Sequence, residues 1–290
     1  MNHFIHILTQ PDNVPIIGML LLVFFFLGLS LWQGFMNDRH RMKPDPKKEV
    51  DKVYVFPYLV RVEFLASLVI LLILIFWSLG IDAPLEEAAN PAKTPNPSKA
   101  PWYFLGLQEM LVYFDPWIAG VVLPSIIIIG LIAIPYLDRN PLGNGYYTIK
   151  ERKIAILIFC FGFIVLWVSM IIVGTFFRGP GWNFFFPWQE WDPHKVVATT
   201  NINLSDLLQI RSKTIASLLG AAVIGTYYGL GFLWYLILKV RKSEFLKDMG
   251  WMRFAVFSLL LFTMMSLPIK MILRYAFNVK YVWVTPWFNI

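Results

Sequence analysis

One short segment of the chain combines residue types that could hold a flat aromatic ring and take up a proton. Trp102, Tyr103 and Phe104 follow Pro101 directly, and Glu109 comes seven residues after Trp102. Seven residues are about two turns of an α-helix, so Glu109 would lie on roughly the same side as Trp102. Aromatic side chains can line a slot for a ring, and a carboxylate that water can reach can accept a proton. We take these five residues as candidate site residues.

Both features also have a simpler interpretation. Aromatic side chains anchor helices at the membrane–water interface, and spacing alone favours this role for residues 102–104. Glu109 could pair with a cation or face water. Its apolar neighbours Leu105, Met110 and Leu111 would desolvate the carboxylate, which favours proton uptake. The residue types by themselves leave both interpretations open.

The segment that carries these residues is too short to cross a membrane. Residues 101–113 would form a helix of roughly 20 Å, whereas the apolar core of a bilayer is about 30 Å thick. Pro101 suits the first turn of such a helix, because the amide that it lacks would be unpaired there. Asp115 is expected to cap the helix that follows. The segment therefore indicates an interfacial or re-entrant helix.

The surrounding chain has the composition of a polytopic membrane protein. Of its 290 residues, 58% are hydrophobic, 17% are aromatic and only 15% are charged, with a mean hydropathy of +0.61. A soluble domain could not bury so much apolar surface. The sequence predicts an all-α fold, because a segment exposed to lipid must satisfy its own backbone. Six stretches are long enough to span: Val14–Phe35, Pro57–Leu79, Trp117–Leu137, Ile154–Phe177, Ile215–Leu238 and Met252–Leu273.

The distribution of positive charge predicts the orientation of these helices. The loops after the first, third and fifth stretches carry six, four and five Lys or Arg residues. The N-terminal segment, the loops after the second and fourth stretches and the C-terminal segment carry none, two, four and two. This bias places both termini outside the cytoplasm. The net charge of +7 is then explained by contact with anionic lipid, and no nucleic-acid partner is expected.

Three regions are expected along the chain. Residues 1–52 form an N-terminal membrane anchor with a basic linker, residues 53–191 a central region, and residues 192–290 a C-terminal helical hairpin. The loop from Phe176 to Trp191 holds eight Phe or Trp residues, typical of an aromatic belt or of a docking face for another subunit. No internal repeat is visible, which disfavours the common transporter architectures.

The central region resembles a known family. The order of its elements is a Pro-rich outer loop, the helix beginning "APWYF", a span, "IPYLDRNPLGNG", and a span ending "IVGTFFRGP". This order, from about Val53 to Arg178, resembles the C-terminal half of cytochrome b. The form most similar is subunit IV of the cytochrome b6f complex, as in split bacterial quinol–cytochrome c reductases. The family carries a Pro-Glu-Trp-Tyr motif, and residues 100–103 are Ala-Pro-Trp-Tyr.

The resemblance implies a subunit that forms part of an outer quinol-oxidation site in the inner membrane of a bacterium. Pro101, Trp102, Tyr103 and Phe104 would bind the quinol, menaquinol or ubiquinol. Pro101 stands where the family has its proton-accepting glutamate, so Glu109 is the expected replacement. Partner chains would be a haem-bearing cytochrome b N-terminal-type subunit, a Rieske iron–sulfur protein and a cytochrome c subunit. The quinol would give one electron to the Rieske cluster and one to haem b.

We expect this chain to bind no haem or metal itself and to be inactive alone. Its four histidines, His3, His6, His40 and His194, fall outside the six stretches, so they cannot supply axial ligands within the membrane. No CxxCH motif is present, and Cys160 is the only cysteine. Two alternatives remain: a non-catalytic scaffold subunit of a respiratory complex, which the proline at 101 favours, and a membrane transporter.

Overall fold

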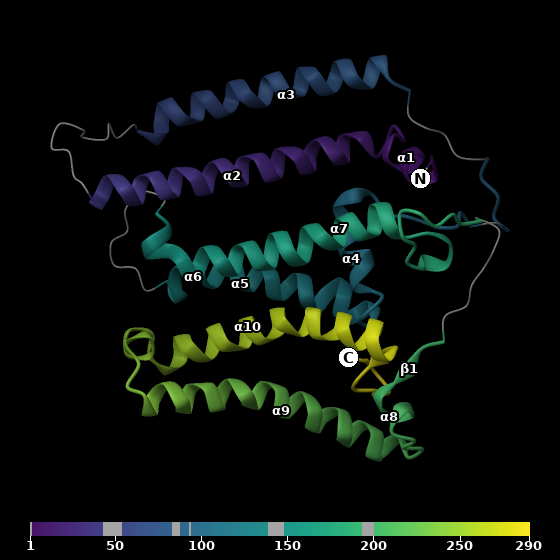
Figure 1. The fold of residues 1–290 in the computed structure, drawn as a ribbon, viewed down its shortest axis with the longest axis vertical. Coiled ribbons are helices and arrows are strands. Elements are labelled where there is room, and N and C mark those ends of the chain that lie inside the picture. The colour runs from purple at the N-terminus through teal and green to yellow at the C-terminus, as the bar shows by residue number, and fades with distance from the viewer. Residues whose placement is uncertain (1, 43–53, 83–87, 93, 139–147, 193–199) are drawn as a thin grey trace. The chain divides into compact units, whose positions relative to one another are not determined.

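The computed structural model describes residues 2–42, 54–82, 88–92, 94–138, 148–192 and 200–290. The chain divides into two compact units (Figure 1). The first comprises Met1–Thr94 and Gly145–Lys153, and the second comprises Pro95–Asn144 and Ile154–Ile290. The three predicted regions remain a prediction. The linker at 43–52 and most of "IPYLDRNPLGNG" lie outside the described residues.

The predicted all-α fold with six spans is confirmed. Six helices in the described part of the chain are long and apolar enough to cross a membrane: Val14–Arg39, Val55–Gly80, Ile118–Leu137, Ile149–Phe177, Lys213–Val240 and Glu244–Phe277. Strand structure is minimal. β1 (Ile202–Asn203) pairs in parallel with β2 (Val279–Tyr281). This pairing joins the chain before α9 (Lys213–Val240) to the chain after α10 (Glu244–Phe277).

The first unit contains α1 (Asn2–Leu8), α2 (Val14–Met42), η1 (Val55–Leu59), which leads into α3 (Val60–Gly80), and the start of α6 (Ile149–Phe159). The buried amide of Asn13 joins α1 to α2 by donating to the carbonyl of Ile7 at 2.7 Å. Asp38 of α2 accepts the amide hydrogens of Ile149 and Lys150, at 3.2 and 3.0 Å, and so caps α6. No residue of α3 is buried, so its apolar surface is left for lipid or another chain.

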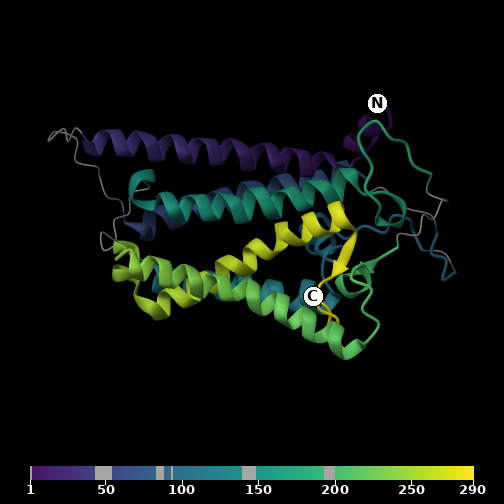
Figure 2. The ribbon, with the colours of Figure 1, turned by 60° about the horizontal axis from the view of Figure 1, so that its bottom comes forward.

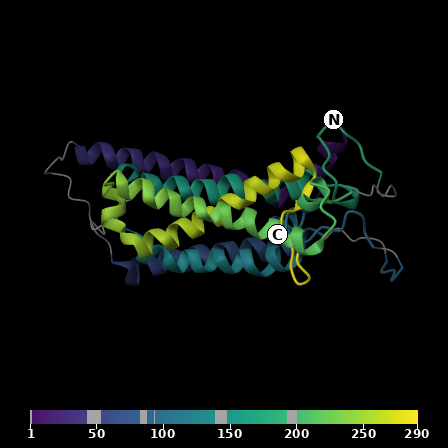
Figure 3. The ribbon, with the colours of Figure 1, turned by 90° about the horizontal axis from the view of Figure 1, so that it is seen from below.

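The second unit contains the candidate site. Its helices are α4 (Trp102–Met110), η2 (Ile118–Val122), α5 (Leu123–Leu137), η3 (Cys160–Val168), α7 (Ser169–Ile172), η4 (Val173–Phe177), η5 (Pro180–Trp182), α8 (Leu204–Leu207), α9 (Lys213–Val240) and α10 (Glu244–Phe277). α4 packs against α7 and η4, and α10 packs against α5, η3 and α9. Figures 2 and 3 show α9 and α10 side by side as a hairpin.

One apolar core links the short helix to the spans around it. The end of α4 and the turn after it contribute Met110, Tyr113 and Phe114, and α10 contributes Leu267. The other buried members are Ala119, Leu166 and Met170. Close van der Waals packing holds these side chains together, because those in the spans would be shielded from water by lipid in any case. The core therefore fixes the C-terminal end of α4 between the fourth span and α10.

The short helix ends earlier than predicted. It runs from Trp102 to Met110, whereas residues 101–113 were expected to be helical. After Met110 the amides of residues 111–113 bond carbonyls only three residues back, which tightens the chain into a turn. The predicted cap is confirmed, because the side chain of Asp115 accepts the amide hydrogen of Trp117 at 3.0 Å.

Candidate functional site

The aromatic face of α4 is open. Trp102, Tyr103 and Phe104 are 39%, 52% and 51% exposed. Their rings contact one another in sequence, with centroids 5.6 Å apart for the first pair and 4.8 Å for the second. Consecutive helical residues point about 100° apart, so the three rings form a convex edge. On this chain they can form one wall of a slot, and a second wall must come from elsewhere.

The opposite side of α4 lies directly against the fourth span. Leu105, Gly106, Glu109 and Met110 are its buried residues. A Cβ on Gly106 would come within 3.2 Å of the Trp167 ring, so the helix rests on that ring with little space between them. This close approach leaves α4 little freedom to move toward or away from η3.

Gln108 fixes the chain that leads into α4. Its Oε1 accepts the amide hydrogen of Ala100, and its Nε2 donates to the carbonyl of Ser98, each at 2.8 Å. Pro101 is the residue before the first helical turn, and its carbonyl accepts the amide hydrogen of Phe104 at 2.8 Å. No sequence pattern indicates this role of Gln108, because both of its partners are backbone groups.

Glu109 is completely buried and forms an ion pair with Arg178. The Arg178 Nε–H donates to Glu109 Oε2 at 2.9 Å, and its Nη2 donates to Oε1. Two more donors complete the hydrogen bonding of the carboxylate. Tyr113 OH donates to Oε1 at 2.8 Å, and the indole of Trp182 donates to Oε2 at 3.2 Å. Each carboxylate oxygen therefore accepts two hydrogen bonds, an arrangement that stabilises its charged form.

Arg178 is the first residue after the fourth span. It is 3% exposed, and besides Glu109 it donates to the carbonyl of Trp182 and to the hydroxyl of Tyr275, each at 2.9 Å. Burial alone would lower the pKa of the guanidinium, but the hydrogen bonds and charge of Glu109 outweigh burial, and the pKa is raised. Arg178 therefore remains a cation.

Tyr113 remains a neutral donor. Burial, followed by the charge of Glu109, raises the pKa of its phenol well above the ordinary value. The backbone of Trp182 has a φ of 58°, which is uncommon for a residue with a side chain. Such positions persist where surrounding contacts hold them, and the indole and carbonyl of Trp182 both bond the ion pair. We refer to Glu109, Arg178, Tyr113, Trp182 and Tyr275 as the Glu109 cluster.

The structure gives the predicted site residues different degrees of burial. Trp102, at the N-terminal end of α4, is 39% exposed, whereas Glu109, two turns further along the same helix, is completely buried. Sequence reasoning did not identify Arg178, Trp182 or Tyr275 as partners of Glu109. The only signal is a single arginine within the aromatic run "TFFRGPGWNFFF", a run that is typical of an aromatic belt or of a docking face for another subunit.

No haem or metal site is formed by the described residues. His3 and His6 lie in α1, outside the spans, while His194 and the side chain of His40 lie outside the described residues. In the described ranges no three His, Cys, Asp or Glu side chains gather where a metal ion could bind. The residues present therefore do not fit the paired axial ligands of a membrane-embedded haem.

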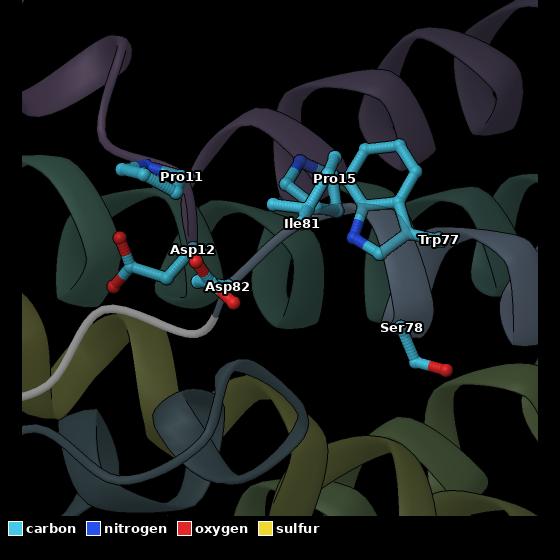
Figure 4. A pocket seen from close by; sticks show the side chains of 7 residues that line it. All are labelled: Pro11, Asp12, Pro15, Trp77, Ser78, Ile81 and Asp82. Atoms are coloured by element: carbon cyan, nitrogen blue, oxygen red, sulfur yellow. The ribbon is translucent and has the colours of Figure 1, made fainter.

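A pocket in the first unit contains none of the predicted site residues. Figure 4 shows Pro11 and Asp12 in the turn between α1 and α2 and Pro15 in the first turn of α2, with residues at and just after the end of α3. The α3 side is Trp77, Ser78, Ile81 and Asp82. Both carboxylates are exposed, so nothing in this pocket sets it apart from an ordinary surface depression.

Comparison with known proteins places α4 within a matched region. Residues 88–176 match the family described as cytochrome b (C-terminal)/b6/petD. The cytochrome b of Epidermophyton floccosum is 34% identical over 115 residues, which are 39% of this chain and 28% of that protein. No solved structure matches. The match includes Glu109 and Tyr113 and ends before Arg178, Trp182 and Tyr275.

Proposed function

We propose that this multi-pass membrane protein is a subunit of a quinol–cytochrome c oxidoreductase and forms part of its outer quinol-oxidation site. Residues 88–176 would form its cytochrome b C-terminal-type region. The observation that carries the proposal is the open aromatic edge of α4 within the matched region. The buried side of α4 packs against the fourth span, so the aromatic edge on its exposed side has a fixed position. A fixed aromatic wall suits a flat quinol ring.

Within such a site this chain would bind and orient the quinol. The half-exposed rings of Trp102, Tyr103 and Phe104 would form one wall, and a partner subunit would complete the slot and exclude water. Oxidation releases two electrons and two protons. Redox groups on partner chains, haem b and a Rieske cluster, would take the electrons, because this chain offers no ligands for them.

The contacts of Glu109 favour a holding role over proton uptake. Both oxygens of this carboxylate are already occupied by hydrogen bonds from Arg178, Tyr113 and Trp182. The sequence predicted Glu109 as a proton acceptor and left pairing with a cation as the alternative. The variant Glu109→Gln separates the two roles, since loss of a base lowers turnover alone and a broken ion pair lowers stability.

Purification from native membranes tests whether the chain belongs to a redox complex. A tagged chain should bring down a haem-bearing subunit, a Rieske protein and a cytochrome c, and the preparation should show b-type haem absorbance. The isolated chain should show none, because histidine pairs are absent from its described spans. A haem-loaded isolated chain, or a homogeneous preparation without redox partners, would contradict the proposal. The second outcome would favour a transporter.

We place the subunit in the inner membrane of a bacterium with both termini outside the cytoplasm. The basic turn between α9 and α10, near Lys242, would then be cytoplasmic, and the loop near Gln189 would be periplasmic, as would α4. A periplasmic reporter inserted after Gln189 should be active, and one inserted after Lys242 should be inactive. The reverse pattern would move α4 to the cytoplasmic side and contradict an outer quinol site.

A further inference from the structure

Helix α10 contributes a side chain to the Glu109 cluster from outside the region matched to cytochrome b. Tyr275 lies near the end of α10, and the matched region ends at residue 176. Its hydroxyl accepts a hydrogen bond from Arg178 Nη2 at 2.9 Å and lies 3.0 Å from the hydroxyl of Tyr113. The C-terminal hairpin thus reaches the charged contact that holds α4.

The direction of each hydrogen bond follows from the groups involved. A guanidinium can only donate and a carboxylate can only accept. Tyr113 has one proton, which it donates to Glu109. The contact between the two phenols must therefore run from Tyr275 to the oxygen of Tyr113. Arg178 also donates to both Tyr275 and Glu109, which closes a ring of four hydrogen bonds. Bonds arranged in such a ring polarise one another.

In this ring of hydrogen bonds, the role of each group as donor or acceptor is set by its neighbours. Without the Tyr275 hydroxyl, Nη2 of Arg178 loses an acceptor and the oxygen of Tyr113 loses a donor. The ring of Tyr275 is held separately, since its centroid lies 6.1 Å from that of Tyr113 and 6.5 Å from that of Phe184. Removing only the hydroxyl should therefore leave the packing of α10 intact while loosening Arg178 on Glu109.

We propose that Tyr275 is a positioning residue of the outer site. It keeps Arg178 bonded to Glu109 and thereby holds α4 in its position against the fourth span. The C-terminal hairpin is then part of the site. This inference rests on the proposed function for its link to quinol. Its structural basis is that α4 has nine residues, too few to be a stable helix without external contacts. Glu109 is the only charged residue on α4, so its pairing is the strongest polar contact available to the helix.

The test compares Tyr275→Phe with Tyr228→Phe in the purified complete complex. Tyr228 is a matched control, because its hydroxyl also bonds across to α10, 3.0 Å from Thr263 Oγ1, but outside the Glu109 cluster. Two quantities are measured. Hydrogen–deuterium exchange reports the stability of residues 102–114, and steady-state kinetics between pH 6 and 8 report KM and kcat for a soluble quinol.

We expect faster exchange in residues 102–114 for Tyr275→Phe and exchange at the parent rate for Tyr228→Phe. The KM for quinol should rise roughly threefold to thirtyfold, with kcat within about twofold of the parent value at each pH. Unchanged exchange in α4 would overturn the inference. So would a pH-dependent loss confined to kcat, because the half-exposed Tyr275 would then be the end of a proton path. If the parent complex does not oxidise quinol, the proposed function fails, while exchange still decides whether Tyr275 holds α4.

Discussion

Replacing Glu109 with glutamine should unfold or strongly destabilise the protein, at a cost of about 3–5 kcal/mol. The reason is the environment of the carboxylate. It is fully buried, and it neutralises a guanidinium that is itself 3% exposed. Removing one partner of a buried ion pair leaves the other charge without compensation, and the remaining hydrogen bonds cannot offset that loss.

Glutamine has nearly the same shape as glutamate, but at this position the similarity of shape does not preserve the hydrogen bonds. One carboxylate oxygen accepts from Arg178 and Tyr113, and the other accepts from Arg178 and Trp182. An amide group has one accepting oxygen and one donating NH₂. Turned toward Trp182, the NH₂ faces two groups that can only donate; turned toward Tyr113, it still faces Arg178, although the hydroxyl can rotate to accept. Glu109→Gln therefore replaces at least one attractive contact with a repulsive one and also removes the charge.

The measurement is the midpoint of thermal unfolding of the purified protein, together with the amount that assembles in the membrane. Glu244→Gln is the control, because Glu244 lies exposed in the first turn of α10. It should behave like the parent. The opposite result is informative: normal stability of Glu109→Gln, with quinol oxidation lowered by about 10²–10⁴-fold, would show that Glu109 acts as a proton acceptor.

A double variant tests whether the loss comes from the unpaired charge. Glu109→Leu with Arg178→Met replaces both partners by apolar side chains, an exchange that is often neutral for buried pairs. The double variant should be more stable than Glu109→Gln, although the donors of Tyr113 and Trp182 lose their acceptor. A double variant less stable than either single variant would mean that the pair contributes more than charge compensation.

The six spans could be predicted from hydropathy because lipid permits only long apolar helices there. Their ends could not. α10 begins at Glu244 although its apolar stretch begins at Met252, because a short helical segment precedes the span and is set off from it by a kink at Gly250, where φ is 73°. The interfacial helix was also predicted, but its last turn was not, because residues 111–113 form tighter hydrogen bonds that depend on the packing of Tyr113 and Phe114.

The pairing of Glu109 could not be derived from one sequence. Arg178 is 69 residues away, and the chain offers many other cations. Local spacing indicated a desolvated carboxylate, and Glu109 is buried, but polar donors rather than apolar side chains contact its oxygens. The choice of Arg178 depends on the packing of α4 against η4, a tertiary contact without a local signature.

The kinetics of a Trp102→Ala complex show whether the open edge of α4 binds quinol. Trp102 is 39% exposed at the N-terminal end of α4 and makes none of the hydrogen bonds of the Glu109 cluster, so its removal should leave that cluster intact. Burying a large apolar side chain against a ligand contributes about 1.5–3 kcal/mol, so kcat/KM for quinol should fall about tenfold to hundredfold.

Trp251→Ala provides the matched control. Trp251 is also exposed, at 64%, and lies in the opposite turn, between α9 and the apolar part of α10. The two variant complexes are purified with equal haem and subunit content, and quinol oxidation is measured in each. The account predicts a fall of at least about tenfold in kcat/KM for Trp102→Ala and the parent value for Trp251→Ala. A fully assembled Trp102→Ala complex that oxidises quinol at the parent kcat/KM would contradict it, and would leave this chain as a scaffold subunit.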